Sequence, residues 1–67
     1  MNKKSFHDKL CDELKRSGLT QKEFAKKTGF TESTMSRYLA GNRLPDFKSL
    51  KRIAKSLKVS VDYLLDI

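Results

Sequence analysis

Four polar side chains share one side of a short helical stretch in residues 28–42, TGFTESTMSRYLAGN. At about 100° per residue, that side carries Glu32, Ser33, Ser36 and Arg37. Arginine donates two parallel hydrogen bonds to O6 and N7 of guanine, glutamate accepts from the amino group of cytosine, and serine does either. Because serine is short, the helix backbone can approach base edges closely. The pattern is typical of a helix that enters the major groove of DNA.

Two of these residues have a second interpretation that the sequence leaves open. An acid in the first turn of a helix interacts favourably with the helix dipole by about 0.3–1 kcal/mol, so Glu32 has a role without any DNA contact. An exposed arginine that binds nothing is the alternative for Arg37. On the opposite side of the helix, Met35 and Tyr38 are predicted to anchor it to the core.

Capping signals predict the helices that must position this stretch. A polar N-cap, usually flanked by apolar residues, opens each of five segments. Thr20 and Glu23 form a Thr-x-x-Glu capping box, and a glycine follows each of the first three segments. The predicted helices are residues 5–17, 21–28, 32–40, 47–57 and 61–66. With no strand signal in the sequence, we expect an all-α fold: a compact five-helix domain covering residues 1–67.

The predicted core lies on two apolar stripes with the 3.6-residue period of half-buried helices. The stripe of the first helix comprises Phe6, Leu10 and Leu14. The stripe of the fourth comprises Leu50, Ile53, Ala54 and Leu57.

Length and composition favour a binding module over an enzyme. A chain of 67 residues leaves little room for an enclosed active site. Hydrophobic residues make up 37% and charged residues 34%, outside the disordered and membrane classes. The N-terminus lacks the apolar stretch of a signal peptide, and the single Cys11 suits a reducing compartment, so we expect a cytoplasmic protein.

The net charge of +7 and the isoelectric point of about 9.8 favour a polyanionic partner. Between residues 37 and 58 the only acid is Asp46, and the basic residues there are Arg37, Arg43, Lys48, Lys51, Arg52, Lys55 and Lys58. For the last four, an ordinary solvated surface is the alternative. An anionic membrane is a third possibility, but no predicted helix combines lysines with a broad exposed apolar face.

Two stretches resemble the Cro and phage-repressor family of bacterial DNA-binding proteins. Residues 20–45, TQKEFAKKTGFTESTMSRYLAGNRLP, look like its helix-turn-helix, and residues 49–65, SLKRIAKSLKVSVDYLL, match its two following helices. The resemblance implies a helix-turn-helix motif at about residues 20–40, with residues 32–40 as the recognition helix. Leu39, where many members carry glutamate, and Thr28, at a commonly apolar position, depart from the pattern.

The resemblance also assigns roles to single residues. Glu32, Ser33 and Arg37 occupy positions that usually contact base edges, and Ser36 is a further candidate. The residues implied in phosphate binding are Thr20, Gln21, Asn42, Arg43 and Lys48. Gln21 also stands at a helix start, where backbone N–H groups can meet a phosphate. Thr20 has a second role as an N-cap, and a merely solvated side chain is the alternative for Lys48.

These features predict a sequence-specific regulator of transcription that binds double-stranded DNA, most simply a repressor on a two-fold symmetric operator. We expect a homodimer, at least on DNA. In the last helix we expect Val61, Leu64 and Leu65 to close the core and Tyr63 and Ile67 to be exposed as a dimer interface. A core or frayed-end position is the alternative for the last two. We expect no cofactor, metal or small-molecule ligand.

A protein-interaction module and an enzyme are the other two function classes that a domain of this kind could represent. In a protein-interaction module, such as an antitoxin-like domain, DNA contact would be secondary. Such a helix should present large apolar anchors outward, which residues 32–40 lack. An enzyme would need a constellation of reactive groups, and the candidates are only His7, Asp8 and Cys11. Two ligands one turn apart do not make a zinc site.

Overall fold

Five helices make up most of residues 5–65, the part of the chain that the computed structural model describes. They are α1 (Phe6–Ser17), α2 (Gln21–Thr28), α3 (Glu32–Ala40), α4 (Phe47–Leu57) and α5 (Val61–Leu65). Residues 5–65 contain no strand. The predicted all-α fold is therefore confirmed. The predicted bounds of α2, α3 and α4 are correct, whereas α1 begins one residue later than predicted; residue 66, the predicted end of the last helix, lies outside the described residues.

Side-chain caps explain why the helices begin where they do. Thr20 and Thr31 each accept a hydrogen bond from the backbone N–H three residues on, at 3.1 Å in both cases. Asp46 does the same for Ser49 at 2.8 Å. Ser5 is the N-cap of α1 and so precedes the helix. At α2 the predicted capping box is complete, because the Glu23 carboxylate accepts from the Thr20 backbone N–H at 2.9 Å.

Each helix contributes one large side chain with no exposed surface to a single core. These five side chains are Leu10, Phe24, Met35, Ile53 and Leu64. The predicted stripes are confirmed for Phe6, Leu50 and Ala54, which are also buried, whereas Leu14 and Leu57 are half-buried and pack against the core. Because all five helices share this small core, removal of any one helix would expose the core side chains of the others.

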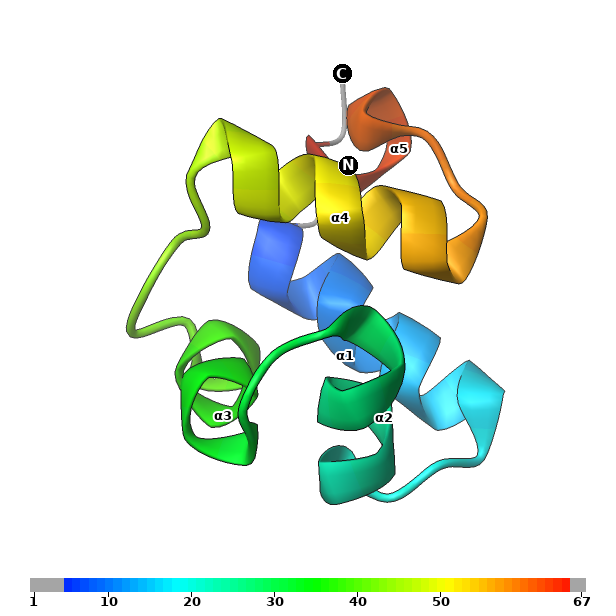
Figure 1. Cartoon of the computed structure of the whole chain (residues 1–67). Helices are drawn as coiled ribbons and strands as arrows, with labels where there is room; N and C mark the ends of the chain where they lie inside the picture. Colours follow the sequence, from blue (N-terminus) through cyan, green and yellow to red (C-terminus); the bar gives the residue numbers. More distant parts are fainter. Residues whose placement is uncertain (1–4, 66–67) are drawn as a thin grey trace.

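Figure 1 shows how the helices surround this core: α1 runs through the middle, α2 and α3 lie on one side of it and α4 with α5 on the other. The closely packed pairs are α2–α3, α1–α3, α2–α4, α1–α5, α4–α5 and α1–α2. A long exposed connection, residues 41–46, joins α3 to α4 along the edge of the molecule. The outer face of α3 and this connection therefore border each other.

The expected division of α5 into buried and exposed residues is partly wrong. Leu64 is buried as expected and Val61 is half-buried against the core, but Leu65 is 42% exposed. Tyr63 is only half-buried rather than exposed, because its ring packs on α1 beneath the Lys9 ammonium, 4.2 Å from the ring centroid. Its hydroxyl lies 3.5 Å from Oε2 of Glu13. Ile67 lies outside the described residues.

The glycine that ends α3 gives a test of this packing. Gly41 has φ of +78°, and a Cβ there would lie 3.2 Å from Cδ2 of His7. We expect Gly41→Ala to lower the free energy of unfolding by about 1–2 kcal/mol from the left-handed conformation alone, and further because the His7 ring must move. Urea unfolding monitored by circular dichroism measures the loss.

Gly18→Ala is the matched control, because Gly18 has φ of +71° and open space where a Cβ would lie. Its loss should be smaller than that of Gly41→Ala. Equal losses would show that the contact between His7 and Gly41 contributes nothing.

Candidate nucleic-acid interface

The outer face of α3 is polar and exposed. Among residues 5–65, no hydrogen bond or ion pair involves the exposed side chains of Glu32, Ser33, Ser36 and Arg37. The inner face holds the helix in place, since Met35 is fully buried and Tyr38 is only 3% exposed. The predicted division of this helix into two faces is therefore confirmed. Its outer groups are free to meet an external partner.

The turn that leads into α3 is fixed by packing. Ala25 in α2 is buried, and Gly29 takes the left-handed conformation that ends α2. Beyond it the Phe30 ring packs edge-to-face against Tyr38, with ring centroids 5.5 Å apart. The turn is therefore held against α3 by a side-chain contact in addition to its covalent connection.

The two departures from the family pattern are accommodated inside the fold. Thr28 is buried, and its hydroxyl donates to the carbonyl oxygens of Phe24 at 2.9 Å and Ala25 at 3.1 Å. A polar side chain is thus satisfied at a buried position. Leu39 is half-buried against the core. Neither residue is exposed, so neither alters the outer face of α3.

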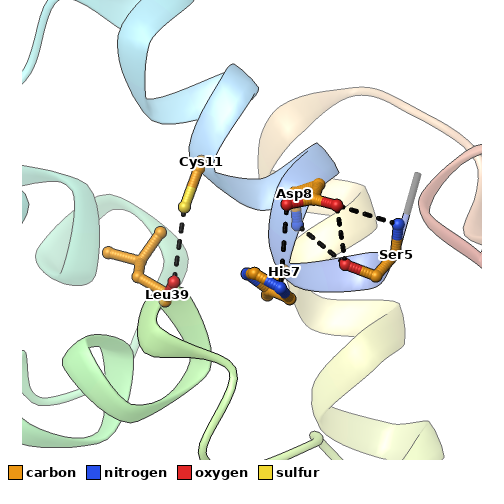
Figure 2. Close-up of polar contacts among 5 residues, drawn as sticks. All are labelled: Ser5, His7, Asp8, Cys11 and Leu39. Carbon is orange, nitrogen blue, oxygen red and sulfur yellow. Dashed lines mark hydrogen bonds and ion pairs between the residues drawn. The ribbon is translucent and has the colours of Figure 1, made fainter.

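Helix α1 supports the other end of α3, as Figure 2 shows. The Cys11 thiol lies 3.3 Å from the carbonyl oxygen of Leu39, in a hydrogen bond to the last turn of the helix. The His7 ring lies beside Gly41, and its Nε2 is 3.7 Å from a carboxylate oxygen of Asp8. Cys11 and His7 thus support the C-terminal end of α3. Within residues 5–65, no three histidine, cysteine or acidic residues are grouped so as to hold a metal.

The predicted phosphate-binding residues lie on the two flanks of α3. Figure 1 shows α3 between α2, which begins at Gln21, and the connection that leads to α4. Gln21 is half-buried and Thr20 is exposed, with its hydroxyl engaged as the cap of α2. Asn42 and Arg43 are exposed on the other flank, where the Asn42 backbone N–H donates to the Arg37 carbonyl at 3.0 Å.

Lys48, also exposed, follows at the second position of α4. The predicted site residues thus form a polar outer face of α3 with basic or amide groups on both sides. This arrangement suits a polyanionic duplex, with short groups facing base edges and longer ones facing the flanking phosphates.

Two apolar residues beside this site had no role in the sequence-based predictions. Leu44 is 73% and Phe47 64% exposed, and the Lys51 ammonium lies 5.1 Å from the centroid of the Phe47 ring. Phe47 is three residues before Leu50 and so continues the apolar stripe of α4. Only the tertiary structure shows that this end of the stripe is uncovered.

The described residues form a small hollow on the surface between α1, α2 and α4. An open hollow of about 130 Å³ is lined by Glu13, Arg16, Ser17, Lys27 and Leu57. Ligand pockets commonly measure about 300–1,000 Å³. None of the helices in residues 5–65 has the length and apolar character needed to cross a lipid bilayer.

Asp46 is the only acid between residues 37 and 58, and its surroundings favour its ionised form. Hydrogen bonds with Ser49, and then the nearby charges of Lys48 and Arg43, lower the pKa of Asp46 below its ordinary value of 3.8. A carboxylate whose pKa is lowered by folding stabilises the folded state above its ordinary pKa. That stabilisation is lost as the pH falls through the lowered value.

The substitution Asp46→Asn should therefore reduce the loss of stability that occurs at low pH. Asparagine is as good an N-cap as aspartate but does not titrate, so the variant should lose less stability than the wild type as the pH falls below about 3.8. Asp46→Ala, which removes the acceptor, should be less stable than the wild type at neutral pH. Melting temperatures between pH 7 and pH 2 check both. Parallel profiles for wild type and Asp46→Asn would show that folding does not lower the pKa of Asp46.

Comparisons with known proteins identify the family of this chain. A family model described as "Helix-turn-helix" matches residues 12–64. The uncharacterized HTH-type transcriptional regulator YqaE of Bacillus subtilis (strain 168) is 42% identical over 60 residues, which cover 90% of this chain and 52% of that protein. The HTH-type transcriptional regulator ImmR of the same organism is 34% identical over 61 residues, covering 91% and 48% respectively. This chain thus spans about half the length of both regulators.

A third similar protein has a different name. Methylphosphonate synthase of Nitrosopumilus maritimus (strain SCM1) is 43% identical over 44 residues, covering 66% of this chain but only 10% of that protein. The similarity is therefore confined to a small segment of a much larger protein.

Proposed function

The chain belongs to the Cro and phage-repressor type of helix-turn-helix proteins, and we propose that it regulates transcription by binding double-stranded DNA in a sequence-specific manner. Two of its relatives are named as transcriptional regulators. The observation that carries the proposal is the outer face of α3. It presents polar side chains that are exposed and unpaired within the described residues. Most of the net positive charge follows directly after it in the sequence.

In the proposed complex α3 enters the major groove. Arg37 donates to O6 and N7 of a guanine, Glu32 accepts from a cytosine amino group, and Ser33 or Ser36 contacts a neighbouring base edge. Short side chains at positions 33 and 36 allow the backbone of α3 to approach the bases.

Phosphate contacts on both flanks fix the position of α3 along the duplex without carrying sequence information. On one flank, Thr20 and Gln21 meet a phosphate at the N-terminus of α2, where backbone N–H groups and the helix dipole favour an anion. On the other, Asn42, Arg43 and Lys48 meet the opposite strand. Affinity should depend strongly on salt because binding of the phosphates by basic residues releases counterions.

Repression by a homodimer completes the proposal. Two copies would place their α3 helices in successive major grooves about 34 Å apart on a two-fold symmetric site. Bound protein that overlaps a promoter excludes polymerase. Of the two residues predicted to join the copies, Tyr63 is half-buried and Ile67 lies outside the described residues; Leu65 in the same helix adds exposed apolar surface.

A partner-binding module is the second candidate function. It is favoured by the exposure of Leu44 and Phe47, since large apolar side chains on a surface are common at protein interfaces. In that case the basic surface would bind DNA without discrimination, or not at all.

Selection from a pool of randomised duplexes at two salt concentrations tests the proposal. We expect enrichment of one motif with two-fold symmetry. Enrichment of a motif without symmetry would remove the dimer from the proposal and keep the regulator. Salt-sensitive binding without any enriched motif would contradict sequence-specific recognition and favour the partner-binding module.

Two substitutions separate base contacts from phosphate contacts. Arg37→Ala should weaken binding to the selected duplex by about 1–3 kcal/mol and relax the preference at one base pair, because a bidentate contact is lost. Arg43→Ala should weaken binding to selected and random duplexes alike and reduce the salt slope by about one ion. Fluorescence anisotropy titrations over a salt series measure both. If Arg37→Ala weakened binding to both duplexes equally, Arg37 would not be a base-reading residue.

A further inference from the structure

Arg52 in α4 holds the turn of the helix-turn-helix from outside the motif. Its Nη1 donates to the carbonyl oxygen of Gly29 at 3.2 Å. Its guanidinium also lies over the ring of Phe30, with 5.4 Å from Cζ to the ring centroid. A Cβ at Gly29 would lie 3.2 Å from Cδ of Arg52, so the arginine stem occupies space that a larger residue there would take. A hydrogen bond and a cation–π contact thus join one side chain to two consecutive residues of the turn.

The contact extends into the recognition helix. Phe30 packs edge-to-face on Tyr38, which is buried on the inner face of α3. Among the helix pairs of residues 5–65 that pack closely, α3 is paired with α1 and α2 but not with α4. Arg52, Phe30 and Tyr38 therefore form a direct link from α4 to α3.

The link connects two parts of the proposed DNA-binding surface. Lys48 is on α4, one turn before Arg52, whereas the base-contacting residues are on α3. A duplex contacted by both requires a fixed angle between the two helices, because a base contact displaced by about 1 Å loses most of its hydrogen bonding.

The chemistry of the contact is specific to arginine. A planar guanidinium can lie on an aromatic ring while an N–H in its plane donates to a carbonyl. A lysine ammonium keeps the charge but has no planar fork, so it cannot make both contacts in the same way. No acidic partner holds Arg52 in the described part of the chain.

We propose that Arg52 is a positioning residue that sets the recognition helix relative to α4, and that it does not bind a DNA phosphate. The proposal rests on the proposed function for its effect on DNA, but its effect on the turn can be measured without DNA. An arginine in a basic segment would otherwise be counted as one more phosphate contact.

Two variants of Arg52 and one control test the proposal. Arg52→Lys keeps the charge, and Arg52→Met keeps the stem but removes the guanidinium. Lys55→Met removes one charge from the same helix at a neighbouring exposed position. Binding of each variant to the selected and random duplexes is measured over a salt series, together with amide hydrogen exchange of the free proteins.

We expect both Arg52 variants to bind the selected duplex about three- to tenfold more weakly, the range for loss of one hydrogen bond. For Arg52→Met, the affinity for random duplex and the salt slope should match those of Lys55→Met. For Arg52→Lys, both should match those of the wild type. Amides of residues 30–40 should exchange faster in both Arg52 variants than in Lys55→Met.

Other outcomes overturn the proposal in different ways. A salt slope reduced by about one ion in Arg52→Met but not in Lys55→Met, with wild-type binding by Arg52→Lys, would make Arg52 a phosphate contact. Unchanged hydrogen exchange in both Arg52 variants would show that it does not hold the turn. If the wild type fails to select any duplex, the proposed function fails, and hydrogen exchange alone decides whether Arg52 positions α3.

Discussion

The fold depends on one small core to which every helix contributes a fully buried side chain. Within that core α3 has only nine residues, and Met35 and Tyr38 supply its buried anchors. A helix so short cannot remain ordered alone in water. The same constraint determines its outer face, because the positions that do not reach the core are those free to carry polar groups. The anchoring of α3 and the proposed recognition of DNA thus use opposite sides of one helix.

Contacts at both ends of α3 add to what the core supplies. At its start the turn is held by the Phe30 ring against Tyr38, and at its end the Cys11 thiol and the His7 ring approach the last turn. These supports come from outside α3, on the turn and on α1. The orientation of α3 is therefore a property of the whole domain and not of the two-helix motif alone.

Much of this fold could be predicted because its signals are local. An N-cap residue acts on the backbone three residues away, and an apolar stripe repeats every turn, so helix bounds and the buried faces of α1, α3 and α4 follow from short stretches of sequence. In α5, a helix of five residues gives too few turns for a period to distinguish Tyr63 from Leu65. The contacts of Arg52 with Gly29 and Phe30 join residues more than twenty positions apart, and no local pattern indicates them. The exposure of Leu44 and Phe47 likewise depends on which surfaces other helices cover.

The outer side chains of α3 form no hydrogen bond or ion pair with the rest of the described chain, and this also affects how such a domain can diverge. Ser33, Ser36 and Arg37 contribute little to the folding free energy, so substitutions at these positions are nearly neutral for stability. If these residues read bases as proposed, a duplicated copy could acquire a new target through a few changes there while the scaffold stays intact. Random substitutions at the same positions would abolish binding to the old target equally easily. The folded protein would persist, because such substitutions do not cause the unfolding and degradation that normally remove damaged variants.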